Sequence, residues 1–128
     1  MEKFYLQKTS FSPEIILDPN ANLFKIVGES RPENVPKFYA PVFKWFESYL
    51  AETSGEKDRQ INLQFNYDYF NSTTAKVMLD LINSITDLST NKLKLVVTWF
   101  YEGMDDDIFD SGKELERLTQ VKFKFIEK

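Results

Sequence analysis

The spacing of apolar residues changes along the chain and predicts where its elements begin and end. Two short apolar runs, Ile15–Leu17 and Leu23–Val27, flank the turn-forming segment Asp18–Asn22 and predict an antiparallel hairpin. A further short strand is predicted at Phe4–Leu6. The segment 61–69 alternates strictly between apolar and polar residues over its whole length, which is typical of a strand with one apolar face.

Two more strands follow towards the C-terminus. Leu93–Tyr101 is almost continuously apolar and β-branched, which predicts a strand in the middle of the sheet with both faces buried. Val121, Phe123 and Phe125 alternate with lysines, so the last strand is predicted to lie at an edge, because lysines discourage pairing with another chain.

Helical periodicity predicts three helices, over Val35–Glu52, Thr73–Ser89 and Asp106–Leu118. Asn34 is the expected N-cap of the first helix. The inward stripe of the second helix is predicted to comprise Val77, Met78, Leu81, Ile82, Ile85 and Leu88. That of the third is predicted to comprise Ile108, Phe109, Gly112, Leu115 and Leu118, with Gly112 allowing close approach to the sheet.

The order of these elements predicts an α/β fold in which residues 1–128 form a single domain. Strands alternate with helices after the hairpin, so we expect a mixed β-sheet of about five strands with three helices packed on it. A chain of 128 residues has enough apolar content, 42%, to bury one core of this kind.

The first predicted helix carries more aromatic residues than a core-facing stripe needs. Its apolar side chains span an arc of about 160°, against the ~100° of an ordinary amphipathic helix. They are Phe38, Tyr39, Val42, Phe43, Trp45, Phe46, Tyr49 and Leu50. A bulky core is the favoured explanation, and an interface for a partner or a second copy is the alternative.

Composition removes several functional classes. The chain has no Cys and no His, which excludes thiolate and imidazole nucleophiles and the common zinc sites. The formal charge of −4 and scattered lysines disfavour nucleic acid as a partner. No apolar run approaches ~20 residues, and the N-terminus does not resemble a signal peptide, so we expect a cytoplasmic protein without a membrane partner.

Two clusters could carry chemistry. The acidic run Asp105–Asp107 begins the third helix, where carboxylates complement the helix dipole; the glycine and glutamate spacing of a calcium loop is missing. The hydroxyls of Ser72, Thr73 and Thr74 begin the second helix, where they could cap it or accept a phosphate. Asn71 or Ser72 could be the cap. We expect no catalytic residue, metal or cofactor.

A resemblance to a known family bears on the hydroxyl cluster. Its most specific segments are Pro32–Asn34 and Tyr69–Lys76, which contains Tyr-Phe-Asn followed by the hydroxyls. Further matching segments are Leu17–Pro19, Phe24–Ser30, Phe38–Val42, Trp45–Phe46, Tyr49–Leu50, Leu79–Leu81 and Val97–Glu102. From Leu17 to Phe125 the chain resembles the SiaC family of bacterial regulatory phosphoproteins, whose fold is related to the STAS anti-sigma-factor antagonists.

The resemblance implies a non-enzymatic, phosphorylation-controlled partner switch. A dedicated Ser/Thr kinase would phosphorylate the hydroxyl after the family's Asn, here Ser72 in place of the more common Thr, with Thr73 and Thr74 as alternatives. A PP2C-type phosphatase would remove the phosphate. The unmodified form would bind, and stimulate, an effector such as a diguanylate cyclase in cyclic di-GMP and biofilm regulation.

The expected partner-binding residues are Asn71, Ser72, Thr73, Thr74 and Lys76. An alternative of another class is a structural or assembly domain that forms a constitutive dimer through the aromatic first helix.

Overall fold

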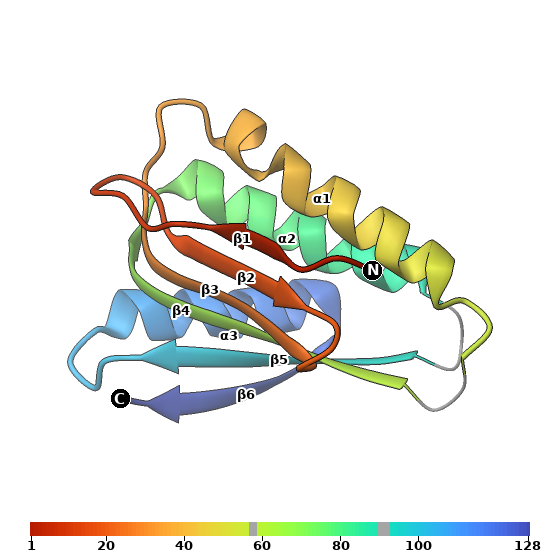
Figure 1. The fold of residues 1–128 in the computed structure, drawn as a ribbon. Helices are drawn as coiled ribbons and strands as arrows, with labels where there is room; N and C mark the ends of the chain where they lie inside the picture. The colour runs from red at the N-terminus through yellow and green to blue at the C-terminus, as the bar shows by residue number, and fades with distance from the viewer. Residues whose placement is uncertain (57–58, 90–92) are drawn as a thin grey trace.

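The computed structural model describes residues 1–56, 59–89 and 93–128, which form six strands and three helices (Figure 1). In chain order they are β1 (Phe4–Leu6), β2 (Glu14–Asp18), β3 (Leu23–Ser30), α1 (Val35–Glu52), β4 (Arg59–Phe70), α2 (Ser72–Leu88), β5 (Leu93–Tyr101), α3 (Asp106–Thr119) and β6 (Lys122–Glu127). The prediction of about five strands is one short, since the Phe4–Leu6 strand joins the sheet.

The sheet is mixed, and its strands lie in chain order from β1 to β6. β1, β2 and β3 pair antiparallel, whereas β3 to β6 pair parallel. Each parallel connection contains a helix, and right-handed crossovers that advance in one direction place all three helices on the same face (Figure 1). No helix of the described residues covers the opposite face of the sheet.

This arrangement corrects the prediction for the strand Leu93–Tyr101. β5 lies beside the edge strand β6, while β3 and β4 occupy the middle of the sheet. Its side chains Val97 and Trp99 are buried under the helices, but Val96 and Phe100, on the helix-free face, are only half-buried. The predicted edge position of the last strand is confirmed.

The hairpin of β2 and β3 forms as the sequence predicts. In its turn the Asp18 carboxylate accepts hydrogen bonds from the backbone N–H groups of Asn20 and Ala21, at 3.1 and 3.3 Å. Asn22 then takes the left-handed conformation, with φ at 51°, which Asn tolerates better than most residues.

The aromatic arc of α1 lies almost entirely in the core. Six of its eight side chains are buried against the sheet and α2, and only Phe38 and Phe43 are half-buried. Phe24 of β3 contacts Trp45, Phe46 and Tyr49 at ring-centroid separations of 5.7–6.1 Å. The core explanation is therefore confirmed, and little of this surface is left for a dimer interface.

A register shift alters the predicted alternation at the end of β4. Gly28 pairs with Tyr67, but the next residue of β3, Glu29, pairs with Tyr69. The extra residue, Asp68, forms a bulge, and such a bulge reverses which side chains point inward. Tyr69 is consequently 49% exposed, whereas Phe70 packs edge-on against Trp99.

The approach of α3 to the sheet depends on Gly112, as predicted. A Cβ atom on Gly112 would lie 2.6 Å from Trp99 Nε1. The same indole nitrogen donates a 2.9 Å hydrogen bond to the carbonyl of Ile108. Two predictions for the inward stripes are wrong, since Leu118 and Leu88 are 47% and 48% exposed. Both lie at C-terminal ends of their helices, beyond the edge of the core.

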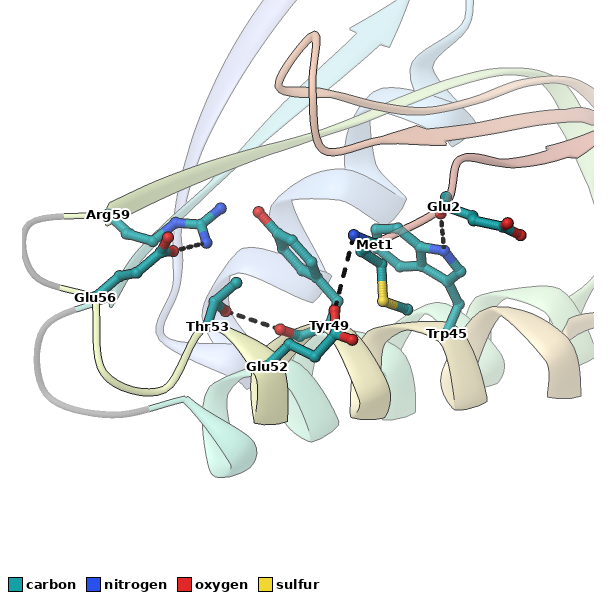
Figure 2. Close-up of polar contacts among 8 residues, drawn as sticks. All are labelled: Met1, Glu2, Trp45, Tyr49, Glu52, Thr53, Glu56 and Arg59. Atoms are coloured by element: carbon teal, nitrogen blue, oxygen red, sulfur yellow. Dashed lines mark hydrogen bonds and ion pairs between the residues drawn. The ribbon is translucent and has the colours of Figure 1, made fainter.

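The N-terminal residues are held against the C-terminal half of α1 (Figure 2). Trp45 Nε1 donates a 3.0 Å hydrogen bond to the carbonyl of Glu2, and the Met1 ammonium lies 3.9 Å from the Glu52 carboxylate. The Arg59 guanidinium lies 4.9 Å from the ring centre of Tyr49 and pairs with Glu56. Within the described ranges, no helix has the length and apolar content needed to cross a membrane.

Candidate functional site at the start of α2

The hydroxyl cluster lies where β4 ends and α2 begins, at the end of the sheet to which the parallel strands run. Asn71 caps α2, because its side-chain oxygen accepts a 2.8 Å hydrogen bond from the backbone N–H of Thr74. Ser72 is the first helical residue, so Asn71 is the cap and Ser72 is free of that role. The two cap candidates left open by the sequence are thereby distinguished.

The three hydroxyls occupy different environments. Ser72 and Thr73 are exposed, as is the side chain of Lys76 one turn further along. Thr74 is completely buried, at 0% exposure. The structure thus brings Ser72, Thr73 and Lys76 to one surface, with Asn71 half-buried beside them and Thr74 beneath.

Beneath this surface, four buried hydroxyls form a continuous hydrogen-bonded chain. Tyr67 of β4 lies 3.0 Å from Tyr39 of α1, and Tyr39 lies 2.7 Å from Ser30 of β3, measured between oxygens. Ser30 in turn lies 2.9 Å from the hydroxyl oxygen of Thr74. The Thr74 hydroxyl donates to the Asn71 side-chain oxygen at 2.8 Å.

The chain has one consistent direction of proton donation. Each hydroxyl carries a single proton, and that of Thr74 is given to Asn71. Ser30 must then donate to Thr74, Tyr39 to Ser30, and Tyr67 to Tyr39. Every hydroxyl donates once, so the network satisfies groups that would otherwise be costly to bury.

Burial also governs the ionisation of the two tyrosines. Loss of hydration raises the pKa of Tyr39, although its hydrogen bonds to Ser30 and Tyr67 oppose this. Burial raises the pKa of Tyr67 well above its ordinary value, and the neighbouring Tyr39 raises it further. Both phenols therefore remain neutral donors at physiological pH.

The network joins four elements at the base of the hydroxyl cluster. Ser30 contributes further through its backbone carbonyl, which accepts a 3.3 Å hydrogen bond from the N–H of Asn71. Ser30 and Thr74 lie 44 positions apart in sequence, and no local pattern indicates that they meet. Sequence reasoning missed Ser30, Tyr39 and Tyr67 for this reason, although Ser30 falls inside a segment that matches the family.

The acidic run Asp105–Asp107 has the structural role expected of a helix start. Asp105 caps α3 by accepting a 3.0 Å hydrogen bond from the N–H of Ile108, and Asp106 and Asp107 occupy the first turn. No cluster of three or more metal-ligating side chains occurs in residues 1–56, 59–89 and 93–128.

A polar depression of about 690 Å³ lies at the C-terminal end of α1, in the region shown in Figure 2. Its cations, the Met1 ammonium and Arg59, are balanced by Glu52 and Glu56. The depression consequently favours neither anionic nor cationic ligands. The surface at the start of α2 is therefore the stronger candidate for a functional site.

The chain is similar in sequence and in fold to proteins of Pseudomonas aeruginosa. An uncharacterized protein of Pseudomonas aeruginosa strain UCBPP-PA14 is 23% identical over 123 residues, which are 96% of this chain and 94% of that protein. Crystallised apo-SiaC from the same species has a TM-score of 0.78 at 23% identity, covering 98% of both chains.

A third comparison is with the crystal structure of the diguanylate cyclase SiaD in complex with its activator SiaC, also from Pseudomonas aeruginosa. Its matching chain gives a TM-score of 0.83 at 20% identity, covering 98% of this chain and 99% of that one. At these identities the structures establish the fold. The family model described as SiaC family regulatory phosphoprotein matches residues 6–128. The chain therefore belongs to the SiaC family of regulatory phosphoproteins and is a regulator, not an enzyme.

Proposed function

We propose that this chain is a phosphorylation-controlled partner switch whose unmodified form binds and stimulates a diguanylate cyclase. A Ser/Thr kinase phosphorylates Ser72, and a PP2C-type phosphatase reverses the modification. The observation that carries this proposal is the exposed hydroxyl of Ser72 at the first position of α2, beside a cap already supplied by Asn71. The SiaC relative crystallised with the cyclase SiaD supports the choice of effector.

The start of α2 can accommodate a phosphate without refolding. Phosphorylation adds about −1.5 to −2 charge, which a helix N-terminus stabilises. Lys76 lies four residues after Ser72, and residues at this spacing share a helix face. The hydroxyl network below runs through Asn71 and Thr74 and does not include Ser72, so the modification leaves those bonds in place.

The same phosphate would exclude a partner packed on this surface. A partner must strip water from the dianion in order to bury it, and an unpaired buried charge costs several kcal/mol. A loss of about 3 kcal/mol weakens binding by more than a hundredfold. The switch then operates by blocking a surface, with no change of fold.

Burial separates the three candidate hydroxyls. A kinase can reach Ser72 and Thr73 on the folded protein, whereas Thr74 is buried and its hydroxyl is already bonded to Asn71. Ser72 also occupies the position that the family resemblance identifies, so we assign the modification to Ser72 and keep Thr73 as the second candidate. We further propose that residues 1–128 form a single regulatory domain whose fold is related to the STAS anti-sigma-factor antagonists. The same proposal places the protein in the cytoplasm.

Purified cyclases of the source organism provide the test. Each diguanylate cyclase is assayed for binding and for cyclic di-GMP synthesis with wild-type protein and with Ser72→Ala, Ser72→Asp and Thr73→Asp. We expect one cyclase to be stimulated by wild type and by Ser72→Ala, and to bind Ser72→Asp at least tenfold more weakly. Stimulation undiminished in Ser72→Asp would contradict the assignment. If Thr73→Asp loses binding and stimulation instead, the switch residue is Thr73.

The dimer alternative makes a different prediction for the same proteins. A constitutive assembly domain would sediment as a dimer at micromolar concentration, and Ser72→Asp would retain all of its partners. Because most of the aromatic arc of α1 is buried in the core, we expect a monomer in the absence of a partner.

A further inference from the structure

A groove of about 690 Å³ runs between α2 and α3 on the outer surface of the helical layer. Its apolar floor consists of Ala75 and Leu79 from α2 and of Leu115 and Leu118 from α3. Leu118 is 47% exposed, although the helical periodicity of α3 places it on the core-facing side. An exposed apolar strip of this kind between two helices is a common docking surface for a third helix.

The α3 wall of the groove is acidic. Asp107 and Asp110 line it, and neither has an ion-pair partner within the described part of the chain. Glu114 also lines it, with its carboxylate held by Arg117 at 2.5 Å. On the opposite wall the Lys76 ammonium lies 3.9 Å from the Asp80 carboxylate, so Asp80 partly neutralises the positive charge that Lys76 brings to the groove. The groove therefore attracts positive charge.

Ser72 lies on the face of α2 that borders this groove. Ser72, Ala75 and Leu79 are spaced by three and four residues, so they form one stripe along the helix. Thr73 belongs instead to a second groove, of about 350 Å³, that α2 forms with α1. α2 and α3 run in the same direction, and both begin at the end of the sheet where Ser72 lies (Figure 1). Ser72 is thus at the mouth of the acidic groove.

We infer that the groove between α2 and α3 is the docking site for an amphipathic helix of the effector, with an apolar stripe flanked by Lys or Arg side chains. The inference rests on the proposed function and adds the chemistry of the partner segment. The apolar stripe packs on Leu79, Leu115 and Leu118, and the basic flank faces Asp107 and Asp110. Apolar burial supplies the affinity. The acidic wall selects the orientation of the partner helix and requires its flanking side chains to be positively charged.

This geometry explains how modification of Ser72 would control a basic partner. Phosphate adds negative charge, which by itself would attract Lys and Arg, so exclusion must come from bulk and from the water that the dianion holds at the mouth of the groove. The expected consequence is that Ser72→Asp, which is smaller than phosphoserine, reduces binding less than phosphorylation does.

The first test uses the cyclase that responds in the experiment above, with two matched pairs of variants. Leu118→Glu lies in the groove, and Leu88→Glu replaces a leucine of the same exposure outside it. Asp110→Lys lies on the acidic wall, and Asp87→Lys reverses an exposed acidic residue elsewhere on α2. We expect Leu118→Glu and Asp110→Lys to weaken binding by at least tenfold and about fivefold respectively, with both controls within twofold of wild type.

Circular dichroism and unfolding midpoints confirm that each variant is folded. Equal losses of cyclase binding in the groove variants and in their controls would overturn the inference. Unchanged binding of Leu118→Glu would also overturn it. In either case the Ser72 variants still test the switch, because their effect does not depend on which groove the partner occupies.

A designed peptide tests the groove without the cyclase. It is an amphipathic helix with leucines on one face and lysines beside them, compared by fluorescence anisotropy with a twin that has glutamates in place of the lysines. We expect the lysine peptide to bind at least tenfold more tightly, with affinity that falls in high salt and is lost in Leu118→Glu. Equal binding of the two peptides would overturn the assigned partner chemistry, even if no cyclase responds.

Discussion

The hydroxyl of Thr74 donates a 2.8 Å hydrogen bond to the side-chain oxygen of Asn71, the residue that caps α2. The same oxygen also accepts the backbone N–H of Thr74, at 2.8 Å. Asn71 is thus held from inside the protein, while its neighbour Ser72 faces solvent. This arrangement separates the residue that builds the helix start from the residue proposed to be modified.

Replacement of Asn71 by Ala should destabilise the protein more than loss of an ordinary cap. The cap bond is worth ~1 kcal/mol, and the buried Thr74 hydroxyl, left without its acceptor, adds about 1 kcal/mol more. Urea unfolding measures the free energy of unfolding. Asp105→Ala, which removes the single cap bond of α3, is the matched control with an expected loss of about 1 kcal/mol. Equal losses in the two variants would show that the Thr74 bond contributes nothing.

Thr74→Val tests the network at its centre with nearly unchanged volume. The substitution removes the proton given to Asn71 and the acceptor used by Ser30, so we expect a loss of about 1–3 kcal/mol in the free energy of unfolding. Thr73→Val, at the adjacent exposed position, should change stability by less than about 0.5 kcal/mol. A neutral Thr74→Val would mean that the hydroxyl chain does not stabilise the fold.

The raised pKa values of Tyr39 and Tyr67 predict a loss of stability in alkali. Above pH ~10 the unfolded chain releases these phenolic protons while the folded protein retains them. The folded state then binds more protons, so stability, complete below pH ~10, falls as pH rises by up to about 1.4 kcal/mol per pH unit for each tyrosine.

Unfolding experiments between pH 9 and 11.5, together with absorbance of tyrosinate, check this prediction. A Tyr39→Phe, Tyr67→Phe double variant should show a shallower dependence on pH, although it is less stable at neutral pH. If the wild type and the double variant lose stability in parallel, other groups are responsible.

Gly112→Ala should disturb the contact of α3 with the sheet. The added methyl would lie 2.6–2.7 Å from three atoms of the Trp99 indole, so helix or ring must move and the 2.9 Å bond to Ile108 weakens. Overpacking of this kind costs about 1–3 kcal/mol. Gly55→Ala, where no atom lies within 4 Å of the new methyl, should stay within about 0.5 kcal/mol. Tryptophan fluorescence and the unfolding midpoint report both effects.

The sequence by itself determined the helices, the hairpin and the strands. Their signals are local: the period of apolar residues, the Asp18 turn and the cap at Asn34. A family resemblance carried by Tyr69–Lys76 also singled out Ser72. These properties depend on residues close together in the chain, so they can be predicted without knowing which elements meet.

Only the tertiary structure decided which hydroxyl is accessible and what surrounds it. Thr74 is buried against Ser30, and Tyr39 and Tyr67 continue the hydrogen-bonded chain from two further elements. Tyr69 faces solvent because a bulge in β4 reverses the alternation. Leu118 is exposed because α3 ends beyond the core, beside α2. Strand order, register and helix placement are set by contacts between distant segments, and a local pattern does not contain them.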